Sequence, residues 1–433
     1  MNCTSIGVSA GALACAFVLH VPAAQAATES VVYSFCGEQS CEDGRAPAAG
    51  LLDVKGVLYG TTFQGGATCE DNEGCGTVFA INLKTGTETV LYSFCSQQNC
   101  VDGYEPDAGL IDVDGTLYGT TYGGGNTNCP YNDSCGTVFS INPKTGAETV
   151  VYAFCNPQYY NDGCFNTANN SFDGYSPRAG LINVNGTLYG TTTEGGDNGG
   201  GIVFAINPAT GAETTVYSFG GYTGDGSYPQ AGLTDVNGTL YGTTLFGGGG
   251  TCTSQEGDGC GTVFSLNPSN GAETVLYAFC SKQNCDGRTD EDGIYPAASL
   301  IAKGDKLYGT TLYGGTYDVG TVFSLSVKTG GETILHSFLD NVSDGQWPNA
   351  GLLDVKGMLY GTTSTGGTQT DGTVFSINPK TGAETVLYSF DSNGADDGLY
   401  PGAGLINVKG ALYGTTTSGG TSGNGGTVFK LTQ

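Results

Sequence analysis

The chain has 433 residues, of which 75 are Gly, and 38% of its residues are hydrophobic. This is enough apolar material for a large core, but the Gly content excludes a mainly helical protein. The formal net charge is −27, and such an acidic surface repels phosphate backbones and anionic lipids, so we expect no nucleic-acid partner and no membrane-surface partner.

Residues 1–26 are typical of a secretory signal peptide, and residues 27–433 are predicted to form one domain. An apolar stretch over residues 6–23 is followed by Ala24-Gln25-Ala26, a small-x-small cleavage pattern, although no Lys or Arg precedes it. Lipoprotein cleavage at Cys15 fits the preceding residues less well, and the apolar run is short and interrupted for a membrane anchor. We therefore expect a secreted, extracellular or periplasmic protein, with no membrane insertion after cleavage.

One pattern repeats seven times over the rest of the chain. Each copy holds Leu-Tyr-Gly-Thr-Thr, a Gly-rich stretch, Gly-Thr-Val-Phe or a close variant, a turn, and a run such as residues 88–94. In the first full copy we expect strands at residues 50–54, 57–62, 77–82 and 88–94, named A to D. Four short strands in each of several repeats are the signature of β-propeller blades. The Leu-Tyr-Gly-Thr-Thr strings begin at Leu58, Leu117, Leu188, Leu240, Leu307, Leu359 and Leu412.

The two ends of the mature chain complement each other. Residues 29–35 form a strand D with no A to C before it, whereas residues 427–433 form a strand C with no D after it. The opening strand therefore supplies what the last blade lacks, and the pairing removes exposed sheet edges. We predict an all-β fold, a seven-bladed β-propeller of four-stranded antiparallel blades, closed by the N-terminal strand that completes the last blade.

The repeated pattern resembles the GloVer tandem repeat of bacterial exported proteins of the choice-of-anchor type. The likeness rests on Leu-Tyr-Gly-Thr-Thr, Gly-Gly, Gly-Thr-Val-Phe, Thr-Gly and Glu-Thr-Val-Leu-Tyr-Ser-Phe, and it extends over all seven copies. The resemblance implies export and propeller-like repeats, and it implies no particular chemistry.

The chain has 16 Cys, of which Cys3 and Cys15 lie in the leader and the others form seven pairs close in sequence. Local pairs in an exported chain indicate disulfides, and a zinc interpretation lacks both His ligands and Cys-x-x-Cys spacing. We expect these disulfides to stiffen loops, and we expect no bound metal. The pairs are Cys36/Cys41, Cys69/Cys75, Cys95/Cys100, Cys129/Cys135, Cys155/Cys164, Cys252/Cys260 and Cys280/Cys285.

Insertions and Cys pairs gather at one end of the predicted ring. Because strand direction alternates within a blade, the B–C and D–A links emerge on one face and the A–B and C–D turns on the other. Every Cys pair and every long insertion lies in a B–C or D–A link. Elaborated loops on a rigid scaffold are where binding usually resides, so we expect the function on this face.

Each D–A link carries Asp-Gly, and six of the seven links carry an aromatic residue two or three positions after the Asp. Sevenfold repetition favours a structural role for the Asp, through hydrogen bonds to nearby backbone, over a calcium or ligand role. The aromatic residues either pack between blades or form a ring of flat faces on which sugars stack. The Asp residues are Asp43, Asp102, Asp173, Asp225, Asp292, Asp344 and Asp397. The aromatic residues are Tyr104, Tyr175, Tyr228, Tyr295, Trp347 and Tyr400.

Catalytic signals are weak. His336 occupies a position that sister repeats fill with Tyr, and the Glu of strand D recurs in every copy, so we interpret both as structural. The chain has three Arg, and all of them lie in D–A links: Arg45, Arg178 and Arg288. Sialidase-type propellers gather three Arg around a ligand carboxylate, so these residues are candidate ligand-binding residues. The Asp-box motif of those propellers has a different spacing, which argues against a sialidase. No carboxylate pair stands out for glycoside hydrolysis.

The sequence favours a monomeric, cofactor-free binding module for extracellular glycan or protein. Two alternatives stay open, namely a polysaccharide hydrolase or lyase and a structural or adhesive surface protein. A hydrolase would need a non-repeated acidic pair at the channel mouth, and an adhesive protein would present a flat polar face.

Overall fold

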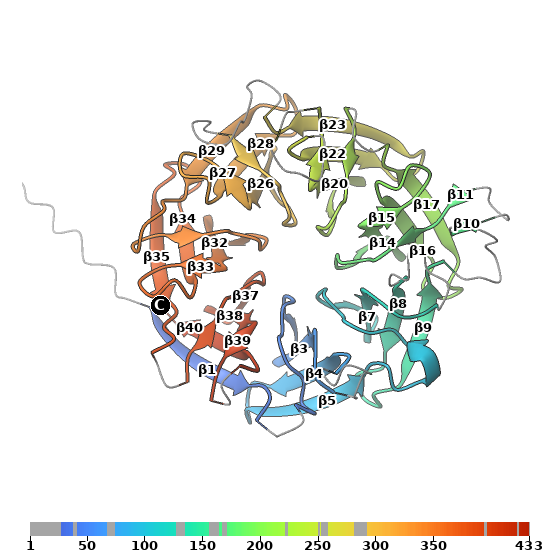
Figure 1. The fold of residues 1–433 in the computed structure, drawn as a ribbon, viewed down its shortest axis with the longest axis horizontal. Helices are drawn as coiled ribbons and strands as arrows, with labels where there is room; N and C mark the ends of the chain where they lie inside the picture. Colours follow the sequence, from blue (N-terminus) through green and yellow to red (C-terminus); the bar gives the residue numbers. More distant parts are fainter. Residues whose placement is uncertain are drawn as a thin grey trace, which may run out of the picture.

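Seven antiparallel sheets of four strands stand around a central axis in this computed structural model (Figure 1). Strands form where the repeats place short runs of Val, Leu, Tyr, Phe and Thr, because β-branched and aromatic side chains suit a pleated, half-buried surface. The predicted all-β, seven-bladed propeller is confirmed. The structure describes residues 27–37, 41–66, 74–126, 135–155, 164–166, 171–220, 224–249, 252, 259–280, 292–393, 396–421 and 424–432.

Within each blade strand A is innermost and strand D is outermost (Figure 1). Blades 1 to 7 take their A strands in the order β2 (Leu52–Val54), β6 (Ile111–Val113), β13 (Ile182–Val184), β19 (Thr234–Val236), β25 (Ile301–Lys303), β31 (Leu353–Val355) and β37 (Ile406–Val408). The B strands are β3 (Val57–Thr62), β7 (Thr116–Thr121), β14 (Thr187–Thr192), β20 (Thr239–Thr244), β26 (Lys306–Thr311), β32 (Met358–Thr363) and β38 (Ala411–Thr416).

The outer two strands of each blade follow the same order. The C strands are β4 (Thr77–Asn82), β8 (Thr137–Ile141), β16 (Ile202–Ile206), β22 (Thr262–Asn267), β28 (Thr321–Ser326), β34 (Thr373–Ile377) and β40 (Thr427–Thr432). The D strands are β5 (Thr87–Ser93), β9 (Glu148–Ala153), β17 (Glu213–Ser218), β23 (Ala272–Ala278), β29 (Glu332–Ser337), β35 (Glu384–Ser389) and, for blade 7, β1 (Thr28–Ser34). A short hairpin of β10 (Phe165–Asn166) and β11 (Ser171–Phe172) and the 3₁₀ helix η1 (Gln98–Cys100) lie in D–A links. Among the described residues, no helix has the length and apolar composition that a membrane crossing requires.

The first strand of the domain completes the last blade, as predicted. β1 pairs antiparallel with β40, with Glu29 opposite Leu431 and Ser34 opposite Thr427. A second contact joins the same two blades near the axis, where the Thr415 hydroxyl donates to the Ala49 carbonyl at 3.2 Å. The equivalent bond links each other blade to the next, for example from Thr61 to the Ala108 carbonyl at 3.1 Å. Blade 7 therefore meets blade 1 through the contacts that join consecutive blades.

The core lies between the blades. A Phe at the end of each D strand packs edge-to-face on a Phe in strand C of the next blade, as Phe94 does on Phe139 with 4.9 Å between ring centroids. Both rings are fully buried. The Gly of Leu-Tyr-Gly-Thr-Thr makes room for this ring, because a Cβ on Gly119 would lie 2.6 Å from Cζ of Phe139. The repeated Gly and Phe are thus two parts of one packing contact.

The two faces of the ring differ as predicted. We call the end that carries the A–B and C–D turns the turn face, and the end that carries the B–C and D–A links the loop face. The A–B turns are tight: in blade 1, Lys55 and Gly56 have φ of 57° and 88°, which are typical of a type I′ hairpin. The predicted signal peptide, residues 1–26, lies outside the described residues.

Candidate functional site

On the loop face, each D–A link runs beside the B–C link of the blade that it enters. In blades 1 and 2 the pairing is a single bridge, between Arg45 and Gln64 and between Tyr104 and Gly123. In blades 3 to 7 it is a two-stranded ribbon. The ribbons are β12 (Gly174–Tyr175) with β15 (Glu194–Gly195), β18 (Gly226–Ser227) with β21 (Phe246–Gly247), β24 (Gly293–Ile294) with β27 (Tyr313–Gly314), β30 (Gly345–Gln346) with β33 (Thr365–Gly366), and β36 (Gly398–Leu399) with β39 (Ser418–Gly419).

The repeated Asp ties each link to the preceding D strand. Oδ2 of Asp102 accepts hydrogen bonds from the Tyr92 hydroxyl at 2.8 Å and from the Ser96 backbone N–H at 2.9 Å. These bonds support the structural interpretation of the repeated Asp, while the calcium alternative stays a prediction. The same Tyr-to-Asp bond joins Tyr33 to Asp43, Tyr152 to Asp173, Tyr217 to Asp225, Tyr277 to Asp292 and Tyr388 to Asp397.

His336 replaces the Tyr of this pair in blade 5. Its Nε2 lies 3.1 Å from Oδ2 of Asp344, and its ring packs edge-to-face on Phe338 at a centroid distance of 4.8 Å. Sister tyrosines make the same two contacts, for example Tyr152 on Phe154. The contacts agree with the prediction that His336 is a packing substitution.

A partly buried Glu from the next D strand faces each Tyr–Asp pair. Oε1 of Glu88 is buried and has no hydrogen-bond partner. Burial raises the pKa of Glu88 to about 7, and the charge of Asp43 adds to the effect. These carboxyls recur at every junction between blades, which supports the structural interpretation of the strand D Glu. The pKa is raised to about 7, mainly by burial, also for Glu29, Glu148, Glu273 and Glu384.

The structure divides the six predicted aromatic residues into two groups. Tyr104 and Tyr175 occupy the second position after the Asp, and both pack against the disulfide-rich core, where Tyr175 is only 8% exposed. The packing interpretation therefore describes these two residues, and we leave them out of the candidate site. Tyr228, Tyr295, Trp347 and Tyr400 occupy the third position, where Trp347 and Tyr400 are 38% and 41% exposed.

The third position has a strained backbone. Its seven residues have φ between 53° and 59°, in the left-handed region, and each is followed by Pro. This conformation costs a non-Gly residue about 1–3 kcal/mol, and a following Pro disfavours it further. Bulky aromatic residues in four successive links are therefore not explained by backbone preference. Blades 1 to 3 have Ala46, Glu105 and Ser176 at this position.

The aromatic rings of blades 4 to 6 form a continuous ladder. Tyr228 and Tyr295 both pack edge-to-face on Phe246, with centroid distances of 5.4 Å. Tyr295 then contacts Tyr313 at 6.1 Å, and Tyr313 contacts Trp347 at 6.2 Å. We call these five residues the aromatic arc. The sequence prediction missed Phe246 and Tyr313, which lie in B–C links two residues after Leu-Tyr-Gly-Thr-Thr.

The structure describes two of the three predicted Arg residues, Arg45 and Arg178. Arg178 forms an ion pair with Asp107 at 3.1 Å, and its guanidinium lies 4.1 Å from the centre of the Tyr122 ring. Arg45 occupies the second position after its Asp, whereas Arg178 occupies the fifth, so their side chains start from non-equivalent places. Arg288 lies outside the described residues.

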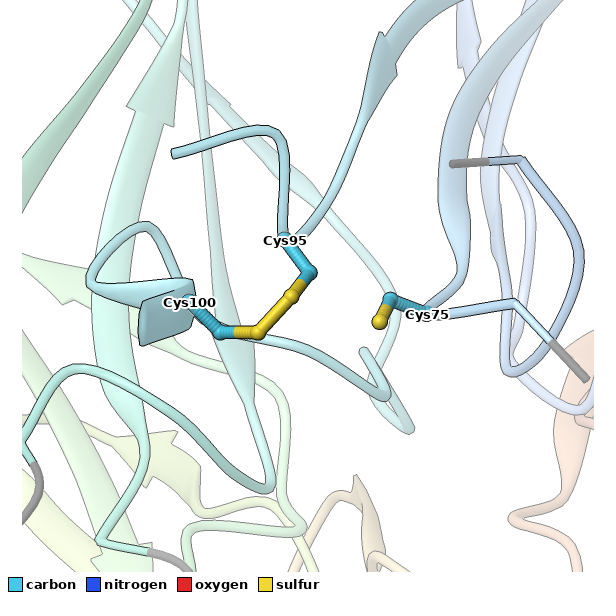
Figure 2. A group of neighbouring side chains, drawn as sticks. All are labelled: Cys75, Cys95 and Cys100. Carbon is cyan, nitrogen blue, oxygen red and sulfur yellow. A yellow bond between two sulfur atoms is a disulfide. The ribbon is translucent and has the colours of Figure 1, made fainter. Parts of the chain in front are cut away.

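Disulfides brace several of the D–A and B–C links on the loop face. The predicted pairs Cys36–Cys41, Cys95–Cys100, Cys155–Cys164 and Cys252–Cys260 are bonded. Cys75, Cys135 and Cys280 are also disulfide-bonded, and their predicted partners Cys69, Cys129 and Cys285 lie outside the described residues. Figure 2 shows Cys75 of a B–C link beside the Cys95–Cys100 disulfide of the next D–A link. Because these sulfurs are oxidised, the group offers no thiolate to a metal.

Comparisons with known proteins identify the repeat. The model of the Gloeobacter/Verrucomicrobia repeat matches residues 17–170, 164–289 and 282–429. The sequence matches no curated protein.

Three solved structures illustrate a distant similarity to this chain. A europium-containing methanol dehydrogenase has a TM-score of 0.48 at 11% identity, over 94% of this chain and 93% of that one. An oligogalacturonate lyase in complex with manganese has a TM-score of 0.44 at 10% identity, over 82% of each chain. A nidogen/laminin complex has a TM-score of 0.40 at 14% identity, over 72% of this chain and 89% of that one. Likenesses at this level carry no argument about activity.

Proposed function

The chain belongs to the Gloeobacter/Verrucomicrobia repeat family, and from this premise we propose that it is an extracellular binding module whose aromatic arc binds glycan. The local disulfides support an oxidising, extracellular location. The chain would act there as a monomer, without a cofactor.

The observation that carries the proposal is the aromatic arc itself. Five aromatic side chains from three consecutive blades touch in sequence, and Tyr313 and Trp347 at its end are each 38% exposed. Aromatic rings offer sugar rings a flat apolar face, and Tyr and Trp keep a polar atom for a hydrogen bond. A neutral contact of this kind also suits a protein of net charge −27, which would repel an anionic ligand from most of its surface.

Backbone strain adds support. Tyr228, Tyr295 and Trp347 adopt a left-handed conformation that Gly or Asn would adopt at lower cost. Strain of this kind clusters at ligand-binding sites, because the surrounding structure must hold it in place. Here the Trp347 N–H donates to the Val319 carbonyl at 2.9 Å, and the Trp347 carbonyl accepts the Ser364 N–H at 3.2 Å.

A glycan array on the mature protein tests the proposal, followed by titration calorimetry with the strongest ligand. We expect Trp347→Ala to weaken binding at least tenfold and Trp347→Phe to weaken it less. Tyr317→Ala is the matched control, because Tyr317 is 54% exposed in a B–C link and makes no ring contact among the described residues. An array without any binding, or equal binding by Trp347→Ala and the control, would refute the proposal.

The same experiment separates the alternatives. Hydrolysis of a polysaccharide panel by the purified protein would favour an enzyme. Binding to extracellular protein but not to glycan would favour an adhesive role for the same face.

A further inference from the structure

A second candidate site lies on the turn face, where blade 7 meets blade 1. A cleft of about 540 Å³ opens there between the A–B and C–D turns of blade 1 and the A–B turn and strands β38 and β40 of blade 7. This volume lies in the range of small-molecule sites. Its rim is fixed by a bond between two turns of blade 1, in which the Leu83 N–H donates to the Gly56 carbonyl at 3.1 Å. The lining includes Lys55, Lys84, Lys409, Lys430 and Tyr413.

The cleft concentrates positive charge on an acidic protein. Four of the 14 Lys and Arg residues line this one cleft, although the chain has a net charge of −27. Among the described residues, none of the four lysines forms an ion pair. Lysines elsewhere on the turn face do pair: Lys303 of blade 5 lies 2.9 Å from Asp354 of blade 6. The lysines of the cleft are therefore available to an external anion.

The carboxylate of Asp53, near Tyr413, already has a hydrogen-bond partner in the protein. Asp53 accepts the Gly56 N–H at 2.8 Å and lies close enough to Tyr413 to affect its titration. Burial raises the pKa of the Tyr413 hydroxyl, and the charge of Asp53 raises it further. The phenol therefore stays protonated and can donate a hydrogen bond into the cleft.

The lysines also depart from the sevenfold pattern. Lys430 lies opposite Tyr413 in the ladder between β38 and β40. The equivalent positions opposite the repeated Tyr hold only small residues, namely Ala80, Ser140, Ala205, Ser265, Ser324 and Ser376. Lys55 and Lys409 have φ of 57° and 54°, at a turn position that Asn185 and Asn237 fill in other blades. Neither the sheet nor the turn requires Lys at these places.

We infer that this lysine cleft binds a compact multivalent oxyanion, a sulfate or phosphate group carried by a saccharide or free in solution. Three ammonium groups from turns (Lys55, Lys84 and Lys409) and one from strand β40 (Lys430) would surround such a group, and the Tyr413 hydroxyl would add a neutral donor. The site lies on the face opposite the aromatic arc, so it does not depend on the proposed glycan binding.

Titration calorimetry with pyrophosphate at low ionic strength tests the inference. Lys430→Ser and Lys409→Asn introduce the residues of sister blades, so the fold should be kept, which circular dichroism can check. We expect each substitution to raise the Kd at least fivefold and the pair to raise it more than twentyfold. Lys356→Asn is the matched control, because Lys356 has the same turn position in blade 6 and φ of 53° but lies outside the cleft. We expect it to leave the Kd within twofold.

Three results would overturn the inference: no saturable binding at millimolar pyrophosphate, equal weakening by Lys356→Asn, or binding that does not fall as salt rises. A second titration, with a sulfated disaccharide and its unsulfated form, identifies the source of the anion. Tighter binding of the sulfated sugar than of pyrophosphate places the group on a saccharide, and the reverse order favours a free ion. The lysine variants leave the aromatic arc unchanged, so they should still bind on the glycan array. A failure of the lysine cleft to bind an anion can therefore be distinguished from a failure of the proposed glycan binding.

Discussion

Replacing Glu88 by Gln should stabilise the propeller at alkaline pH and leave it unchanged at acid pH. Folding raises the pKa of Glu88 from 4.5 to about 7, chiefly by burial. Its contribution to stability is therefore fully present below pH 4.5 and is lost as the pH rises through 7. The difference between the two values corresponds to about 3 kcal/mol at high pH. Because the side chain is only half-buried, solvent screening reduces this to about 1–2 kcal/mol.

Thermal unfolding followed by circular dichroism at pH 4 and pH 8.5 measures the effect. At pH 8.5 we expect the Gln variant to melt about 1–4 °C above the wild type, and at pH 4 the two should coincide. Asp114→Asn is the control, because Asp114 lies in an exposed A–B turn whose sister turns hold Asn185 and Asn237. Since other strand D Glu residues share the raised pKa, the wild type itself should lose stability as the pH rises from 4.5 to about 7. Equal destabilisation of the Gln variant at both pH values would show that the carboxyl acts through packing, and the ionisation argument would be wrong.

Three further predictions concern the scaffold. Deleting residues 27–35 leaves the outer edge of β40 without a partner strand, and we expect loss of the cooperative thermal transition, whereas an unchanged transition would contradict closure by β1. Gly119→Ala should destabilise the fold by about 1–3 kcal/mol through the Phe139 ring. The matched variant Gly50→Ala should melt like the wild type, since its nearest contact is 3.8 Å away. Replacing Cys95 and Cys100 by Ser should cost about 2 kcal/mol in thermal unfolding and leave the far-ultraviolet spectrum unchanged, and an altered spectrum would mean that this disulfide holds the fold itself.

Much of the fold could be predicted from the sequence because each repeat specifies its own strands. The B and C strands of blade 1 have the bounds predicted for them, since Val, Leu, Tyr and Phe run up to Gly-rich or polar turns. Strand A was predicted to begin at Gly50 but begins at Leu52, because residue 50 packs near the axis, where its carbonyl lies close to Gly109 of the next blade. That contact joins residues 59 apart and leaves no local signal.

The candidate sites were harder to predict. The prediction grouped Tyr104 with Tyr228 because each lies two or three residues after the repeated Asp. The Pro that follows distinguishes them: Tyr228 directly precedes Pro229, whereas Glu105 separates Tyr104 from Pro106. The residue before the Pro adopts a left-handed backbone, so the side chains of the two positions leave the link in different directions. Phe246 joins the aromatic arc only through a ribbon between two links, and no local pattern indicates that pairing.

The distribution of repeated and unrepeated residues argues that function resides in the departures from sevenfold symmetry. Residues that recur in the blades, such as the Phe pairs, the Thr-to-Ala bonds and the Tyr–Asp pairs, account for how consecutive blades hold together. The aromatic arc and the lysine cleft are not among those repeated contacts, and each carries a cost, either bulky side chains at a strained backbone position or unpaired like charges. Natural sequences tend to lose destabilising residues unless a function requires them. Binding of a ligand would stabilise both the aromatic arc and the lysine cleft, and it explains why such residues are kept at both. Because the two sites lie on opposite faces and are built from different side chains, their ligands should bind independently, and variants of one site should leave the affinity of the other unchanged.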